Sequence, residues 1–142
     1  MYEDLTKLLN QLDDGPYGEW IIDKENDGSP EHPLQFPYVH FLNEVVGDLM
    51  DTVYHYANNG HDYLFLYDET IQAGGVDIRN IPLKDVDVSS LDGKTVLAML
   101  MMAIREDRFC EGALLEYFEN GSIRKWLQRL QEIDIAKEHN MG

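Results

Sequence analysis

Apolar side chains recur every three or four residues along most of this chain, a spacing that is typical of helices with one buried face. The longest stripe in the first half runs from Tyr38 to Ala57, with acidic residues on its opposite side. Turn-forming residues, including Asn58-Asn59-Gly60 and Gly74-Gly75, separate the stripes. The pattern therefore predicts helices over residues 3–12, 38–57 and 62–73, the last capped by Asp62, and a short strand over residues 19–23.

The second half contains the most apolar segment of the chain, Val96–Ile104. Because this segment is apolar on every side, the helix that contains it is predicted to lie at the centre of the fold. Ser89 followed by Asp92 resembles a capping box. The central helix is therefore predicted to open there and to run to about Asp107.

Two further helical patterns follow. Residues 109–119 predict a helix whose inward side includes Phe109, and Asn120-Gly121 predicts its left-handed end. Ser122 is the predicted cap of a last helix, whose apolar stripe runs from Ile123 to Ile133. Residues 136–142 are predicted to form a frayed tail.

These patterns predict a mainly α protein that forms a single compact domain over residues 1–142, with five or six helices. At most a minor pair of short strands is expected near residues 18–23. Residues 24–37 contain three prolines and no apolar period, so they are predicted to form an acidic, proline-containing loop.

Charge is the strongest signal in the composition. The chain carries 27 acidic and 11 basic side chains, a formal charge of −16, and residues 1–91 hold 18 of the acids but only four of the bases. Such a field repels the phosphate backbone of nucleic acids. Nucleic acid is therefore a disfavoured partner, whereas a protein partner for the acidic part of the chain is favoured.

The amino-terminal stretch MYEDLTKLLNQLDD has acids where a signal peptide carries bases. The longest apolar run, Val96–Ile104, is about half of the roughly 20 residues needed to cross a bilayer. We therefore expect a cytoplasmic protein without a membrane span. No residue spacing indicates a cofactor, and nothing in the pattern specifies an oligomeric state.

The carboxyl-terminal half has a specific pattern: Arg105-x-x-Arg108-Phe109-Cys110-x-Gly112, then Gly121-x-Ile123 and Trp126-Leu127-x-Arg129-Leu130. With residues 88–134, and more loosely 18–39, it resembles a family of uncharacterised bacterial and archaeal proteins catalogued as a domain of unknown function. The resemblance implies a small prokaryotic protein and transfers no activity or catalytic residue.

Three residue patterns were tested as candidate sites: a calcium loop, a cysteine nucleophile and a histidine metal site. The loop that starts at Asp23 has acids and a glycine at calcium-loop positions, but Leu34 stands where a bidentate glutamate is required, so a solvated acidic loop is favoured and no metal site is predicted. Cys110 could act as a nucleophile beside a histidine, although burial in the core is favoured. The histidines show no metal-binding spacing; they are His32, His40, His55, His61 and His139.

Four arginines are the candidate ligand-binding residues. Arg105 and Arg108 fall where the central helix ends, so they are expected to bond its last carbonyls and form a structural corner, with an anion-binding site as the alternative. Arg124 and Arg129 lie on the exposed side of the last helix, which matches a helix-turn-helix recognition helix or, more commonly, a helical hairpin with a solvated basic face.

The leading hypothesis is a non-enzymatic protein-interaction or regulatory module. The acidic asymmetry and the aromatic, proline-containing stretch Phe36-Pro37-Tyr38 favour it. One alternative is an enzyme in which a histidine converges with carboxylates or Cys110 in one pocket. Others are an acidic mimic of nucleic acid and a helix-turn-helix DNA binder.

Overall fold

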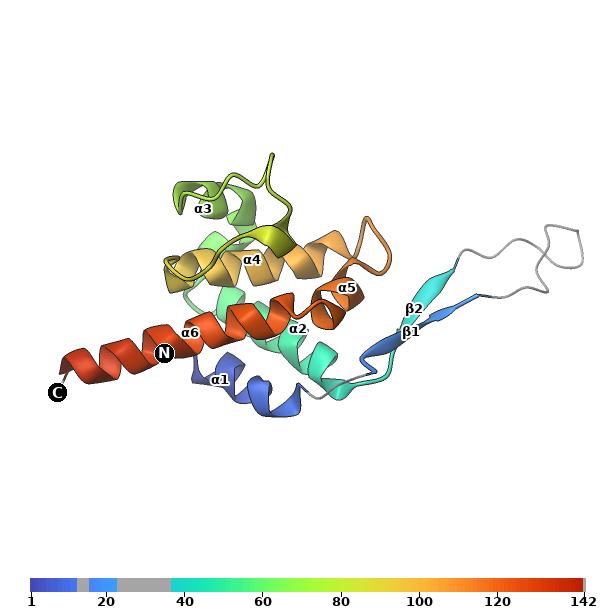
Figure 1. The fold of residues 1–142 in the computed structure, drawn as a ribbon, viewed down its shortest axis with the longest axis horizontal. Helices are drawn as coiled ribbons and strands as arrows, with labels where there is room; N and C mark the ends of the chain where they lie inside the picture. The colour runs from blue at the N-terminus through green and yellow to red at the C-terminus, as the bar shows by residue number, and fades with distance from the viewer. Residues whose placement is uncertain (13–15, 23–36, 142) are drawn as a thin grey trace, which may run out of the picture.

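The computed structural model describes residues 1–12, 16–22 and 37–141, with side chains up to residue 137. The calcium-loop candidate that starts at Asp23, and the acidic, proline-containing loop predicted over residues 24–37 except Pro37, therefore lie outside the described residues. Helices form a compact bundle, and a two-stranded hairpin extends from one end of it (Figure 1). The α-helices are α1 (Glu3–Thr6), α2 (Glu44–Asn58), α3 (Tyr67–Ala73), α4 (Gly93–Glu106), α5 (Ala113–Glu119) and α6 (Ser122–Met141).

Helix α4 lies at the centre of the bundle, as its apolar sequence predicts. It packs against α2, α3, α5 and α6, and its residues from Val96 to Met101 are buried. The apolar stripe of α6 is also confirmed, because Ile123, Trp126 and Leu130 are all 0–1% exposed. In the described part of the chain the bundle also contains short 3-10 helices: η1 (Lys7–Gln11), η2 (Asp62–Leu66) and η3 (Leu83–Asp85).

The predicted helix over 38–57 is wrong in its first turn. Tyr38–Phe41 forms strand β2, which pairs antiparallel with β1 (Gly18–Ile21), so that Trp20 lies opposite Val39. Helix α2 begins only at Glu44, after Asn43 accepts a 3.0 Å hydrogen bond from the Val45 amide. The backbone of residues 38–41 finds its partners in a strand about 20 residues away, and a local helical period does not contain that information.

Two predicted caps are also wrong. Helix α4 opens at Asp92 rather than at Ser89: the Asp92 carboxylate accepts a 2.8 Å hydrogen bond from the Thr95 amide, and bonding to Thr95 lowers the pKa of Asp92. Residues 62–66 form the 3-10 helix η2 with no side-chain cap from Asp62, and α-helix follows only from Tyr67. The predicted Ser122 cap is a third error, because Ser122 is the first residue of α6 and it is the Asn120 side chain that accepts a 3.0 Å hydrogen bond, from the Ser122 amide.

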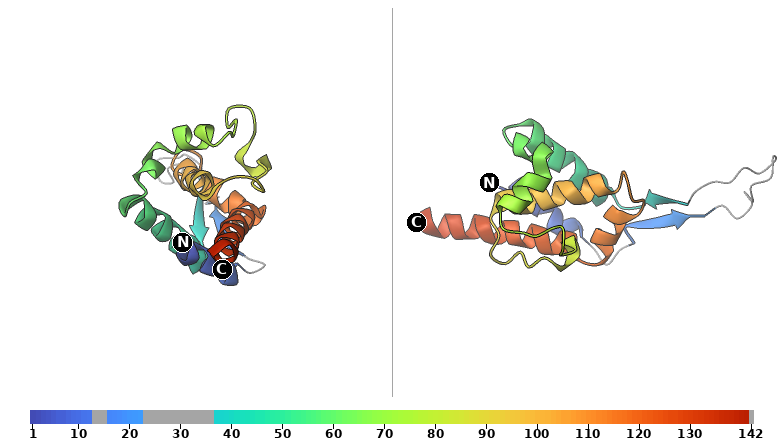
Figure 2. Two further views of the ribbon diagram at one scale, coloured as in Figure 1. Left: turned by 90° about the vertical axis from the view of Figure 1, so that its left-hand side faces the viewer. Right: turned by 90° about the horizontal axis from the view of Figure 1, so that it is seen from above.

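The amino-terminal segment is hydrogen-bonded to α6 and to α2. The Asp134 carboxylate accepts a 2.8 Å hydrogen bond from the Tyr2 amide, and the Tyr56 hydroxyl on α2 donates to the Met1 carbonyl at 3.1 Å. Both ends of the chain therefore lie on the side of the bundle opposite the hairpin (Figure 2). Helical backbone continues to Met141, through the segment predicted as a frayed tail. No helix among the described residues is long and apolar enough to span a bilayer.

Candidate functional site

The turn between α4 and α5, residues 107–112, is built by its own backbone. The amides of Arg108, Phe109 and Cys110 bond the carbonyls of Arg105 and Glu106 at 2.9–3.1 Å, so these carbonyls at the end of α4 are satisfied without any guanidinium. Gly112 has φ 91°, a left-handed conformation that ends the turn and lets α5 begin at Ala113. The predicted helix over 109–119 is therefore wrong in its first turn.

Phe109 and Cys110 are both misplaced by the sequence prediction. Phe109 is 86% exposed, although its spacing predicts an inward side chain. Cys110 is exposed rather than buried. The helical period fails here because Gly112 breaks it three residues after Phe109, which leaves both side chains on the outside of a turn.

The hairpin of β1 and β2 packs against this turn. The Trp20 ring of β1 lies directly over Gly112, where a Cβ atom would collide with it, and the Val39 amide of β2 donates a 2.7 Å hydrogen bond to Glu111 Oε1. Trp20 nevertheless remains 47% exposed. We call the surface formed by Trp20, Phe109 and the rest of residues 107–112 the hairpin–turn surface.

Arg105 and Arg108 occupy different environments. Arg105 is partly buried beside the hydroxyls of Tyr54 on α2 and Tyr67 on α3. Both hydroxyls raise the pKa of Arg105, Tyr54 more than Tyr67. Within the described residues, Arg105 Nε and the Tyr54 hydroxyl are buried without a hydrogen-bond partner. Arg108 is exposed, with no ion pair in the part of the chain described. The expectation that both guanidiniums bond the end of α4 is therefore wrong.

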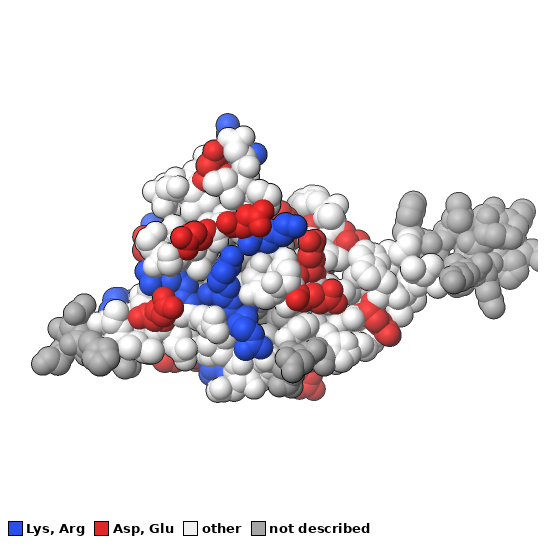
Figure 3. Space-filling view, viewed as in Figure 1, with Lys and Arg blue, Asp and Glu red and all other residues white. Residues whose placement is uncertain are grey.

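Three basic side chains of α6 bond backbone carbonyls of other segments. Lys125 Nζ donates to the carbonyls of Lys84 and Val86 at 3.1 and 3.2 Å, and Arg129 Nε donates to that of Leu91 at 2.9 Å. Arg124 donates to the Leu12 carbonyl. Figure 3 shows the basic side chains gathered in the middle of this face with acids around them. These cations hold the irregular segment before α4 and the end of η1 against α6.

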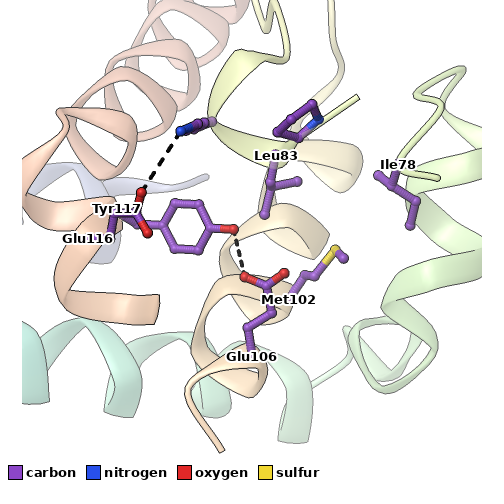
Figure 4. A pocket seen from close by; sticks show the side chains of 8 residues that line it. Ile78, Leu83, Met102, Glu106, Glu116 and Tyr117 are labelled. Atoms are coloured by element: carbon purple, nitrogen blue, oxygen red, sulfur yellow. Dashed lines mark hydrogen bonds and ion pairs between the residues drawn. The ribbon is translucent and has the colours of Figure 1, made fainter. Parts of the chain in front are cut away.

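A pocket of about 280 Å³ opens between α4, α5 and the segment from Ile78 to Lys84 (Figure 4). Its polar centre is Glu106 Oε2, which accepts a 2.6 Å hydrogen bond from the Tyr117 hydroxyl. Burial raises the pKa of Tyr117, and the hydrogen bond to Glu106 raises it further. The phenol therefore stays protonated and continues to donate this bond to Glu106. Across the opening, Lys84 Nζ lies 3.9 Å from Glu116 Oε1.

The rest of the pocket wall is apolar, formed by Ile78, Pro82, Leu83 and Met102. Two carboxylates and one ammonium therefore line a pocket whose wall is partly apolar, and the excess of carboxylates favours a cation over an anion. Sequence reasoning missed this site. Glu106 and Tyr117 are 11 residues apart on either side of a turn, and Lys84 comes from a distant segment, so no local spacing could indicate it.

The described histidines have different surroundings. His40 is exposed on β2, His55 Nδ1 lies 3.3 Å from the Asn59 amide nitrogen, and the His61 ring stacks edge-on between Tyr56 and Tyr63. Across residues 1–12, 16–22 and 37–137, no group of three potential metal ligands occurs. His55 lines one pocket with Asp4 and Asp51, but among the described residues no hydrogen bond joins a histidine to a carboxylate or to Cys110. His32 and the side chain of His139 lie outside these residues.

A family model matches residues 2–136, nearly the whole chain. The protein therefore belongs to DUF6508, described as a family of unknown function, which confirms the resemblance inferred from the motif pattern. The comparison with curated proteins finds no match, and the comparison with solved structures finds none either.

Proposed function

We propose that this protein is an interaction module that binds a basic segment of another protein through the hairpin–turn surface. The observation that carries the proposal is Phe109, a large apolar side chain that is 86% exposed on the same turn that seats the half-exposed Trp20. Aromatic side chains such as Phe and Trp are enriched at the cores of protein interfaces.

The hairpin–turn surface is held in shape before any partner arrives. Glu111 bonds the Val39 amide, and the Asp107 carboxylate accepts a 3.2 Å hydrogen bond from the Leu114 amide at the start of α5. A surface fixed in this way loses little conformational entropy on binding. Exposure of Phe109 is thus a property of an ordered turn.

Charge indicates the chemistry of the partner. The formal charge of −16 attracts a basic protein at long range and accelerates its association. The cations of α6 would by themselves favour a nucleic acid as the partner. They already donate hydrogen bonds to backbone carbonyls, however, which supports a protein partner instead.

Affinity capture from the native host tests the proposal with three baits: the wild-type protein, Phe109→Ser and Phe65→Ser. Phe65 is a matched control because it is 50% exposed on η2, a different element. We expect a basic protein that the wild type and the Phe65 variant retain and that the Phe109 variant loses, with the affinity for the purified partner falling about 10- to 100-fold. Equal capture by all three baits would refute the proposal.

A further inference from the structure

We propose that the pocket at Glu106 and Tyr117 receives the guanidinium group of an arginine side chain, presented by the basic partner; this inference rests on the proposed function. Glu106 ends α4 immediately before residue 107, so the pocket adjoins the turn that carries Phe109. A partner anchored on that turn therefore lies within reach of the pocket.

The geometry of Glu106 indicates a cation with several donors. One carboxylate oxygen accepts from Tyr117, and among the described residues the other oxygen has no hydrogen-bond partner. The tyrosine thus fixes the orientation of the carboxylate and leaves one oxygen for a ligand (Figure 4). Glu116 adds a second carboxylate at the opening.

A guanidinium group fits this arrangement better than an ammonium group. Its five N–H donors lie in one plane and can serve two carboxylates together, and its weak hydration lowers the cost of entering a partly apolar site. The Tyr117 ring and the thioether of Met102 line the same hollow and offer surface to the flat cation and its alkyl stem. The volume of about 280 Å³ suits one side chain rather than a larger ligand.

Lys84 is the internal competitor for this position. Its ammonium lies 3.9 Å from Glu116, and both side chains are at least half exposed, so this ion pair contributes little stability and yields easily. An incoming guanidinium can therefore displace Lys84 from Glu116. Removing the Lys84 charge should accordingly strengthen binding of the arginine, an effect that a purely structural role of the ion pair does not predict.

The test uses blocked tripeptides, acetyl-Gly-X-Gly-amide, where X is arginine or its uncharged analogue citrulline. Binding to the full chain is followed by ¹⁵N NMR at the amides of Met102, Glu106 and Tyr117. We expect saturable binding of the arginine peptide and binding of the citrulline peptide at least about tenfold weaker. Free agmatine is the comparison for a small-molecule source; binding much tighter than that of the arginine peptide would overturn the assignment to a protein side chain.

Three variants locate the site. Glu106→Gln keeps an oxygen for the Tyr117 hydrogen bond, so it should fold, and it should weaken arginine binding at least about tenfold. Glu119→Gln makes the same charge change at an exposed residue of α5 outside the pocket and should have no effect. Lys84→Met should tighten binding. Equal binding of arginine and citrulline, or equal losses for the two glutamine variants, would overturn the proposal.

The failure of this inference can be told apart from the failure of the proposed function. Phe109→Ser should abolish capture of the partner and leave the arginine-peptide titration unchanged. If the peptide binds through Glu106 while capture is independent of Phe109, the interaction surface is wrong and the pocket stands. If capture depends on Phe109 while arginine and citrulline bind equally, the surface stands and the pocket assignment is wrong.

Discussion

Replacing Gly112 by alanine tests how the hairpin is attached to the helical bundle. The new methyl group would meet two separate obstacles. The backbone at residue 112 has φ 91°, a conformation that residues with a Cβ atom rarely adopt, and the Cβ position is already occupied by the Trp20 ring. Gly121→Ala is the matched control, because Gly121 has φ 84° and no atom within 4 Å of its Cβ position.

The expected magnitude follows from these two terms. The left-handed backbone costs an alanine about 1–2 kcal/mol at either position. Trp20 is 47% exposed, so its contacts cover about half of a side chain that buries roughly 200 Å² when fully enclosed. Displacing it exposes about 100 Å², or about 2.5 kcal/mol at 25 cal/mol per Å². Gly121→Ala should therefore lower the free energy of unfolding by about 1–2 kcal/mol and Gly112→Ala by about 3.5–4.5 kcal/mol.

Urea denaturation of the three proteins measures the loss, and ¹⁹F NMR of fluorotryptophan-labelled protein reports the cause. Trp126 is fully buried and Trp20 half exposed, so two resonances are expected, which Trp20→Phe assigns. Gly112→Ala should move the Trp20 resonance toward its value in the unfolded chain and leave that of Trp126 in place. Equal losses of unfolding free energy in the two alanine variants, with an unmoved Trp20 resonance, would refute the packing of Trp20 on Gly112.

Two further predictions concern stability. Lys125→Met removes the hydrogen bonds to the carbonyls of Lys84 and Val86 and should lower the unfolding free energy by about 1–3 kcal/mol. The control Gln128→Ala, on the same helix, should change it by less than about 0.5 kcal/mol. Equal urea midpoints for the two variants would contradict this prediction. Burial raises the pKa of Tyr56 from 10.0 to about 12, so the unfolded chain releases this proton first. The stability that protonated Tyr56 contributes is complete below pH 10 and is lost as the pH rises to 12. Urea titrations across this range should show a fall in the free energy of unfolding, and Tyr56→Phe should reduce that fall. An identical fall in the variant would contradict the prediction.

The sequence was informative wherever one element carries its own evidence. The unbroken apolar run Val96–Ile104 identified the central helix, and the stripe from Ile123 to Ile133 identified the buried face of α6. Gly121 at a helix end was also predicted correctly, since a left-handed residue there is a local requirement. In these cases helical period and turn chemistry act within a few residues, so the chain alone contains the answer.

Side-chain surroundings were decided by contacts between distant segments. Residues 38–41 were predicted to begin a helix, but pairing with β1 made them a strand. Phe109 fits an inward helical position, but Gly112 ended the period and the seating of Trp20 shaped the turn, which left Phe109 outside.

The same distinction separates the charged residues. The sequence predicted Arg124 and Arg129 on the exposed side of the last helix. Both are instead partly buried, because the fold brings the carbonyls of Leu12 and Leu91 to them. The pocket needs Glu106 and Tyr117 from either side of a turn and Lys84 from a segment before α4. Composition determined the acidic character of the protein, because charge adds up along a chain whatever its shape. The tertiary structure decided which of those acids face a hollow, because that depends on distances that the order of residues does not specify.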